Sequence, residues 1–131
     1  MKSIWLILCL LFACSCEDKE NSNNIYEYTA YFARSLVVCA SGAIEMTIAT
    51  DSTITGSWDI SPADGFSEKD IGPQIGTGKL EGNIKAGKIF MNLNPGWADN
   101  NIFLNADYSK DQFKGSWLWS TFIGSSASGS F

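Results

Sequence analysis

Apolar and polar residues alternate in segment after segment of this chain, and turn residues separate the segments. The clearest example is residues 79–93, where alternation over 79–85 resumes over 88–93 after the two-residue turn Ala86-Gly87. Successive side chains of a strand point to opposite faces, so a period of two predicts half-buried strands, and the short turn predicts a hairpin. The same alternation defines further inward-facing sets: Tyr26, Tyr28, Ala30 and Phe32; Ile44, Met46 and Ile48; Ile54, Gly56, Trp58 and Ile60; Ile102, Leu104 and Ala106; Phe113, Gly115, Trp117 and Trp119. Since no segment has a helical period, the sequence predicts an all-β, antiparallel fold of about eight strands.

In four segments a glycine has an apolar residue two positions before it and another two positions after it. These segments are 54–58, 80–84, 113–117 and 127–131. Glycine weakens a strand unless the strand coils sharply or a neighbouring ring fills the vacated space, as happens in small closed barrels. These short, Gly-punctuated strands resemble the calycin type of barrel, such as the lipocalin-like and avidin-like exported proteins, over roughly residues 43–131. The resemblance implies a small up-and-down barrel, and it transfers no ligand-binding residues.

The N-terminus has the pattern of a secretory signal: Met1, Lys2 and Ser3 precede an apolar run over residues 4–13. The run is shorter than the roughly 20 residues that span a bilayer. The sequence Leu11-Phe12-Ala13-Cys14 resembles the lipobox of bacterial lipoproteins, which implies cleavage after residue 13 and lipidation of Cys14. Cys16 is the alternative acceptor.

Residues 14–24 are mostly charged or amide-bearing, which predicts a solvated, flexible tether in front of a single domain over residues 25–131. The acidic run beside the cysteines also resembles the surface-export signal of Bacteroidetes lipoproteins. That resemblance implies that the protein lies on the outward face of the outer membrane. The alternative is an acidic linker that carries no export signal. The sequence therefore predicts a lipid anchor in the outer membrane and leaves open whether the domain faces the periplasm or the outside.

The chain is acidic, with Lys+Arg 9 against Asp+Glu 14 and a net charge of −5. An acidic domain is a poor partner for nucleic acid and for anionic lipid. We therefore expect its membrane association to come from the acyl chains alone.

Cys39 is the cysteine that lies within the expected domain. If Cys14 carries the lipid, Cys16 and Cys39 could form a disulfide in an oxidising envelope. If Cys16 carries the lipid, Cys39 is expected to be a buried thiol that follows an apolar run.

Catalysis is constrained by the absence of histidine from the chain. Ser-His-Asp and Cys-His arrangements and His-bearing zinc sites are excluded, and too few thiols remain for a Cys-only metal site. The carboxylates Glu45, Asp59, Glu81 and Asp107 fall on the outward phase of their strands, as expected for a solvated face. We expect a protein that is not an enzyme, with no catalytic residues, cofactor or metal.

The aromatic residues offer the most specific hypothesis. Trp58, Trp117, Trp119 and Tyr28 share the inward phase and either fill the barrel or line a pocket for a small apolar ligand. Trp97, on a turn with Pro95 and Gly96, is the candidate for a surface contact.

The function expected from these features is a lipid-anchored, non-enzymatic binding module for a small apolar ligand. One alternative is an inhibitor of an envelope or extracellular hydrolase that uses loops 62–77 and 94–101. A second alternative is a structural accessory of an outer-membrane complex.

Overall fold

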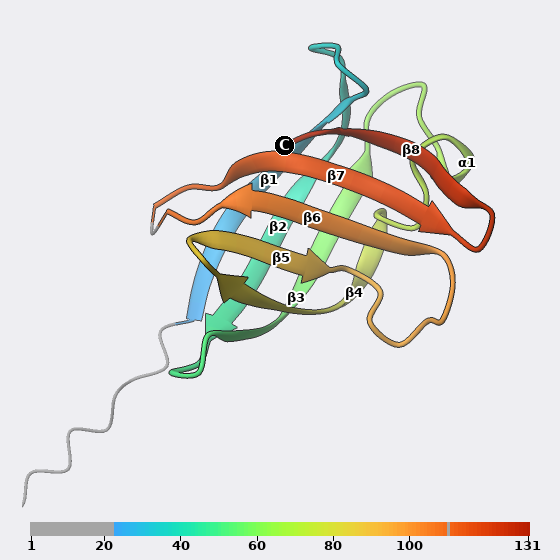
Figure 1. Ribbon diagram of the computed structural model, residues 1–131. Helices are drawn as coiled ribbons and strands as arrows, with labels where there is room; N and C mark the ends of the chain where they lie inside the picture. Colours follow the sequence, from blue (N-terminus) through green and yellow to red (C-terminus); the bar gives the residue numbers. More distant parts are fainter. Residues whose placement is uncertain (1–22, 110) are drawn as a thin grey trace, which may run out of the picture.

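Eight strands close into one antiparallel barrel in the computed structural model, which describes residues 23–109 and 111–131 (Figure 1). The strands are β1 (Asn23–Phe32), β2 (Val38–Ile48), β3 (Thr53–Pro62), β4 (Gly76–Lys85), β5 (Lys88–Asn92), β6 (Asn101–Asp107), β7 (Lys114–Thr121) and β8 (Gly124–Ser130). They follow one another around the barrel in chain order. The prediction of an all-β, up-and-down barrel of about eight strands is confirmed.

The start of the barrel lies slightly earlier than expected. β1 begins at Asn23, and its second residue, Asn24, already pairs with Met46 of β2, whereas the tether was expected to extend to residue 24. The expected signal peptide, both candidate lipid acceptors and the rest of the tether lie outside the described residues. The described residues contain no helix capable of spanning a membrane.

Side chains of the predicted inward phase form the core. Its largest fully buried members include Trp117, Met46, Ile54, Ile60, Leu80, Ile89, Ile102 and Leu104. Because these residues come from six of the eight strands, burial of one face of each strand supplies a single interior.

Two of the four glycines that the sequence placed on the inward phase, Gly56 and Gly129, lie where neighbouring groups leave no room for a side chain. A Cβ atom at Gly129 on β8 would lie 2.5 Å from Nε1 of Trp117, so the indole occupies the space of the missing side chain. A Cβ at Gly56 on β3 would collide with the backbone of β2 at Glu45. The neighbouring ring predicted as a reason for inward glycines is thus present at Gly129, whereas at Gly56 the structure shows a different reason, the close approach of the β2 backbone.

One end of the barrel is plugged by the long connection between β3 and β4. The sequence predicted an irregular stretch here, and the structure adds a single helical turn, α1 (Glu68–Ile71). Asp70 Oδ2 accepts hydrogen bonds from Ser67 N (2.9 Å) and Ser67 Oγ (2.7 Å), which fixes the start of this turn. Ile71 and Gln74 are fully buried, so this connection covers the interior at that end of the barrel.

The barrel is closed through only a short seam. β1 and β8 pair at Tyr31 with Ser130 and at Phe32 with Gly129, and Ala33 N donates to Ser128 O at 2.9 Å. Residues 23–30 of β1 do not pair with β8. The wall is therefore incomplete beside the first part of β1, at the end opposite α1.

Candidate ligand-binding site

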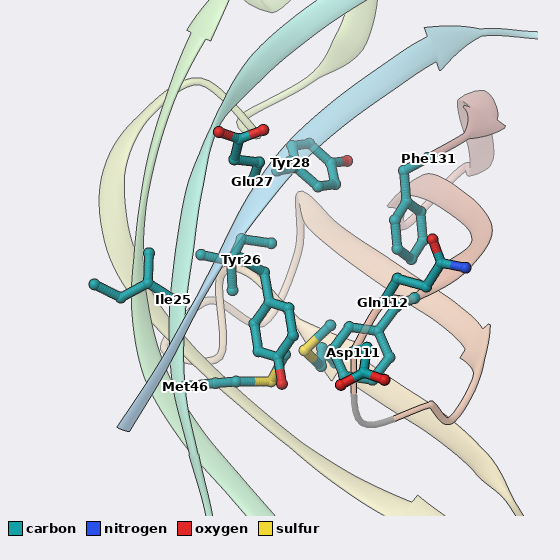
Figure 2. Close-up of a pocket in the computed structure, with 11 residues that line it drawn as sticks. Ile25, Tyr26, Glu27, Tyr28, Met46, Asp111, Gln112 and Phe131 are labelled. Carbon is teal, nitrogen blue, oxygen red and sulfur yellow. The ribbon is translucent and has the colours of Figure 1, made fainter. Parts of the chain in front are cut away.

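A cavity of about 330 Å³ lies at this incomplete part of the wall (Figure 2). Its lining comes from the first part of β1, the middle of β2, β5, the segment before β7 and the residue after β8. The lining residues are Ile25, Tyr26, Glu27, Tyr28, Ile44, Met46, Met91, Asp111, Gln112, Phe113 and Phe131. Both outward-phase residues of early β1, Ile25 and Glu27, belong to this set, so the cavity reaches the surface beside that strand.

The alternation of β1 positions the two tyrosines. Tyr26 and Tyr28 are separated by one residue and therefore point to the same, inner face of the barrel. The ring of Tyr26 lies 4.8 Å from that of Phe113, and the ring of Tyr28 lies 5.6 Å from that of Phe131, both in tilted arrangements. The aromatic wall thus joins β1 to chain segments on the other side of the seam.

Tyr28, which lines the cavity, belongs to a buried polar pair with Gln74. The Tyr28 hydroxyl donates to Oε1 of Gln74 at 3.1 Å, and Nε2 of Gln74 donates to the carbonyl oxygen of Ile71 at 2.9 Å. Burial, with a smaller contribution from Cys39, raises the pKa of Tyr28 far above its ordinary value. Tyr28 is therefore a neutral hydrogen-bond donor whose polar end is already satisfied, and it presents mainly its ring to the cavity.

The rim of the cavity carries negative charge. Glu27 and Asp111 contribute carboxylates and Gln112 an amide, as Figure 2 shows for the residues around Tyr26. Desolvation, followed by the charges of Tyr108 and Asp111, raises the pKa of Tyr26. The carboxylates of Glu27 and Asp111 at the rim can accept hydrogen bonds from a ligand and disfavour an anionic one.

The residues proposed from the sequence are not brought together into one site. Tyr28 lines the cavity, but Trp58 and Trp117 are core residues whose indole nitrogens donate to Leu93 O (2.8 Å) and Tyr31 O (3.1 Å). Trp119 lies at the plugged end, where its ring packs on Gly72 and its Nε1 donates to Asn100 Oδ1 at 2.6 Å.

Most of the cavity residues were not predicted from the sequence. Tyr26, Met46, Met91 and Phe113 were all on the inward phase, but alternation does not distinguish a residue beside a cavity from one in a filled interior. Asp111 and Gln112 lie on a connection between strands, for which the pattern gives no direction.

The other residues considered from the sequence have defined positions in the barrel. Asp59, Glu81 and Asp107 are exposed on the outer face, and Glu45 is half-buried. Among residues 23–109 and 111–131, no three His, Cys, Asp or Glu residues are grouped so that they could hold a metal ion. Cys39 is fully buried and unbridged there, and its thiol donates to Ala30 O at 3.4 Å.

Comparison with known proteins gives no family for this chain. No protein-family model, no curated protein and no solved structure matches it. The barrel and its surfaces are therefore the basis for proposing a function.

Proposed function

We propose that the protein is a non-enzymatic, lipid-anchored binding module of the cell envelope that holds a small apolar molecule beside β1. The observation that carries this proposal is the 330 Å³ cavity, which is lined by four aromatic rings and two methionines. Ligand sites are typically concave and mostly apolar, with volumes of about 300–1,000 Å³. The volume lies at the lower limit of this range, which favours a small ligand.

The lining also restricts the chemistry of the ligand. Met46 and Met91 are flexible and polarisable, so they can adapt to an irregular apolar body. The carboxylates of Glu27 and Asp111 at the rim disfavour an anionic group there. An apolar molecule with a neutral or cationic end fits these properties best.

The position of the cavity agrees with a membrane source for the ligand. Ile25 and Tyr26 line the cavity and directly follow the segment proposed as the tether. With a lipid on Cys14 or Cys16, this end of the barrel would be the one tethered closest to the membrane. Apolar molecules concentrate in the membrane, and the gap beside β1 would give them a short route into the cavity.

Binding can be tested with N-phenylnaphthylamine, a neutral probe whose fluorescence rises in apolar surroundings. We expect saturable binding to the intact protein, and at least about tenfold weaker binding by Ile44→Phe, which adds bulk at the cavity wall. Ile123→Ser, on the exposed connection between β7 and β8, is the matched control and should bind normally. Failure of the folded wild-type protein to bind the probe, with no small molecule in native mass spectra, would contradict the proposal.

A second candidate function, contact with a protein partner, is favoured by one surface. Trp97, Phe122 and Ile123 are 71%, 79% and 98% exposed, and Asp99 Oδ1 accepts a hydrogen bond from Phe122 N at 2.7 Å, joining the two loops. Exposed apolar residues mark an interaction site where they form a contiguous patch, and the hydrogen bond between the two loops favours such a patch here. The loop of residues 94–101 therefore suits the hydrolase-inhibitor alternative, while residues 71–75 of loop 62–77 are used in plugging the barrel.

The two candidates can be separated by one pair of variants. If a partner enzyme is recovered with the wild-type protein, Trp97→Ala combined with Phe122→Ala should abolish its recovery and inhibition, while Ile44→Phe should not. Recovery that survives the double substitution would exclude this surface as the contact.

A further inference from the structure

A groove of about 460 Å³ crosses the outer face of the barrel over β4, β5, β6 and β7. The side chains that form it have the outward phase of their strands, so they point away from the core and from the cavity beside β1. Those that matter for its chemistry are Asn83, Phe90, Asn92, Phe103, Asn105 and Leu118.

The strand register places amides beside each aromatic ring of the groove. Phe90 on β5 pairs with Asn83 on β4 and with Asn105 on β6. Phe103 on β6 pairs with Asn92 on β5 and with Leu118 on β7. Directly opposed residues on one face of an antiparallel sheet are neighbours, so each ring has an amide within reach of whatever covers it.

The two rings are available to a ligand. Phe90 is 41% exposed and Phe103 is 42% exposed, although both occupy outward positions at which polar residues are usual. Covering the free face of an aromatic ring removes apolar surface from water, which is favourable.

The amides differ in how they are held. Asn92 is fixed by the protein, because Oδ1 accepts from Asn94 N at 2.9 Å and Nδ2 donates to Asn101 Oδ1 at 2.9 Å. The side chains of Asn83 and Asn105 form no such hydrogen bonds with other described residues. Each offers one acceptor and two donors to a ligand.

We infer that this groove binds a neutral oligosaccharide. A sugar ring combines an apolar C–H face, which can stack on Phe90 or Phe103, with hydroxyl groups that both donate to and accept from Asn83 and Asn105. Glu81 is the single charged residue among the groove residues, so a charged ligand would find little complementarity. A purely apolar partner would bury the same amides without hydrogen bonds, which is unfavourable.

Cellohexaose and hexa-N-acetylchitohexaose are suitable probes because both are neutral and straight-chained. The full mature protein is titrated with each hexaose, and binding is measured by calorimetry and by backbone amide NMR shifts. We expect saturable binding of at least one hexaose, with the shifts centred on β5 and β6. Phe90→Ala and Phe103→Ala should each weaken binding at least about tenfold. Phe90→Tyr, which keeps the ring, should retain binding, and Asp64→Ala, on the exposed part of the connection between β3 and β4 and outside the groove, should not change it.

Three results would overturn the inference: no binding of either hexaose by the folded protein, unchanged binding by both alanine variants, or a dimer that Phe90→Ala dissociates in light scattering. The last result would assign the groove to a second copy of the chain. The groove and the cavity beside β1 are separate sites, so N-phenylnaphthylamine should remain bound when a hexaose is added. Loss of one site would therefore leave the test of the other intact.

Discussion

The hydroxyl group of Tyr28 on β1 donates a hydrogen bond to Oε1 of Gln74 across 3.1 Å, and both side chains are buried. Gln74 in turn donates to the carbonyl oxygen of Ile71 at the end of α1. This pair connects the strand that lines the cavity with the segment that plugs the opposite end of the barrel. The stability of the plug and the shape of the inner cavity wall should therefore be coupled.

Tyr28→Phe should lower the free energy of unfolding by about 1–3 kcal/mol, because Gln74 Oε1 would remain buried without a donor. Gln74→Leu should have a similar effect by leaving the Tyr28 hydroxyl unpaired. The double variant should cost less than the two single changes together, since no buried partner of the pair remains. Urea denaturation of the four proteins measures this coupling, and strictly additive effects would show that the two side chains are energetically independent.

Gly129→Ala should destabilise the barrel strongly, because the added methyl group would lie against Trp117 and the backbone of β1 at Tyr31. Gly96→Ala is a matched control: a Cβ atom there has nothing within 4 Å. Thermal unfolding should show a clearly lower midpoint for the first variant and little change for the second. Equal midpoints would mean that the seam adjusts to the extra methyl group without cost.

Acid should weaken the plugged end through Asp70. Hydrogen bonds from the Ser67 side chain and backbone hold the pKa of Asp70 below its ordinary value of 3.8. A carboxyl group with a lowered folded-state pKa stabilises the fold above its unfolded pKa, and this contribution is lost as the pH falls through the folded-state value. Asp70→Asn should therefore flatten the pH dependence of hydrogen exchange around α1 below about pH 4. An unchanged acid profile in that variant would assign the effect to other carboxylates.

Cys39 should resist thiol reagents in the folded protein. Its side chain is fully buried and burial raises the pKa of its thiol, so little reactive thiolate is present or accessible. Alkylation followed by peptide mass spectrometry should label Cys39 only after unfolding in urea. A requirement for reductant as well would instead reveal the disulfide with Cys16 that the sequence left open, and rapid labelling without urea would contradict the buried position.

The sequence was sufficient for the fold because strand alternation is a local property. Burial of Tyr28, Ile54, Leu80, Ile89 and Trp117 follows from a period of two, and the turn Ala86-Gly87 sets the hairpin of β4 and β5 in the predicted place. The four-residue helix α1 was not predicted, because a single helical turn is too short to show a helical period of apolar residues.

The candidate site was decided by tertiary structure. The sequence by itself determined that Trp58, Trp117 and Tyr28 point inward, but their phase is the same whether they fill the interior or border a cavity. The glycine at position 129 receives the Trp117 indole, the turn after β3 fills one end, and β8 meets β1 at only two residue pairs. Together these long-range contacts leave the space beside Tyr26 and Phe113, because it is packing between distant segments that determines where a barrel is filled and where it stays hollow.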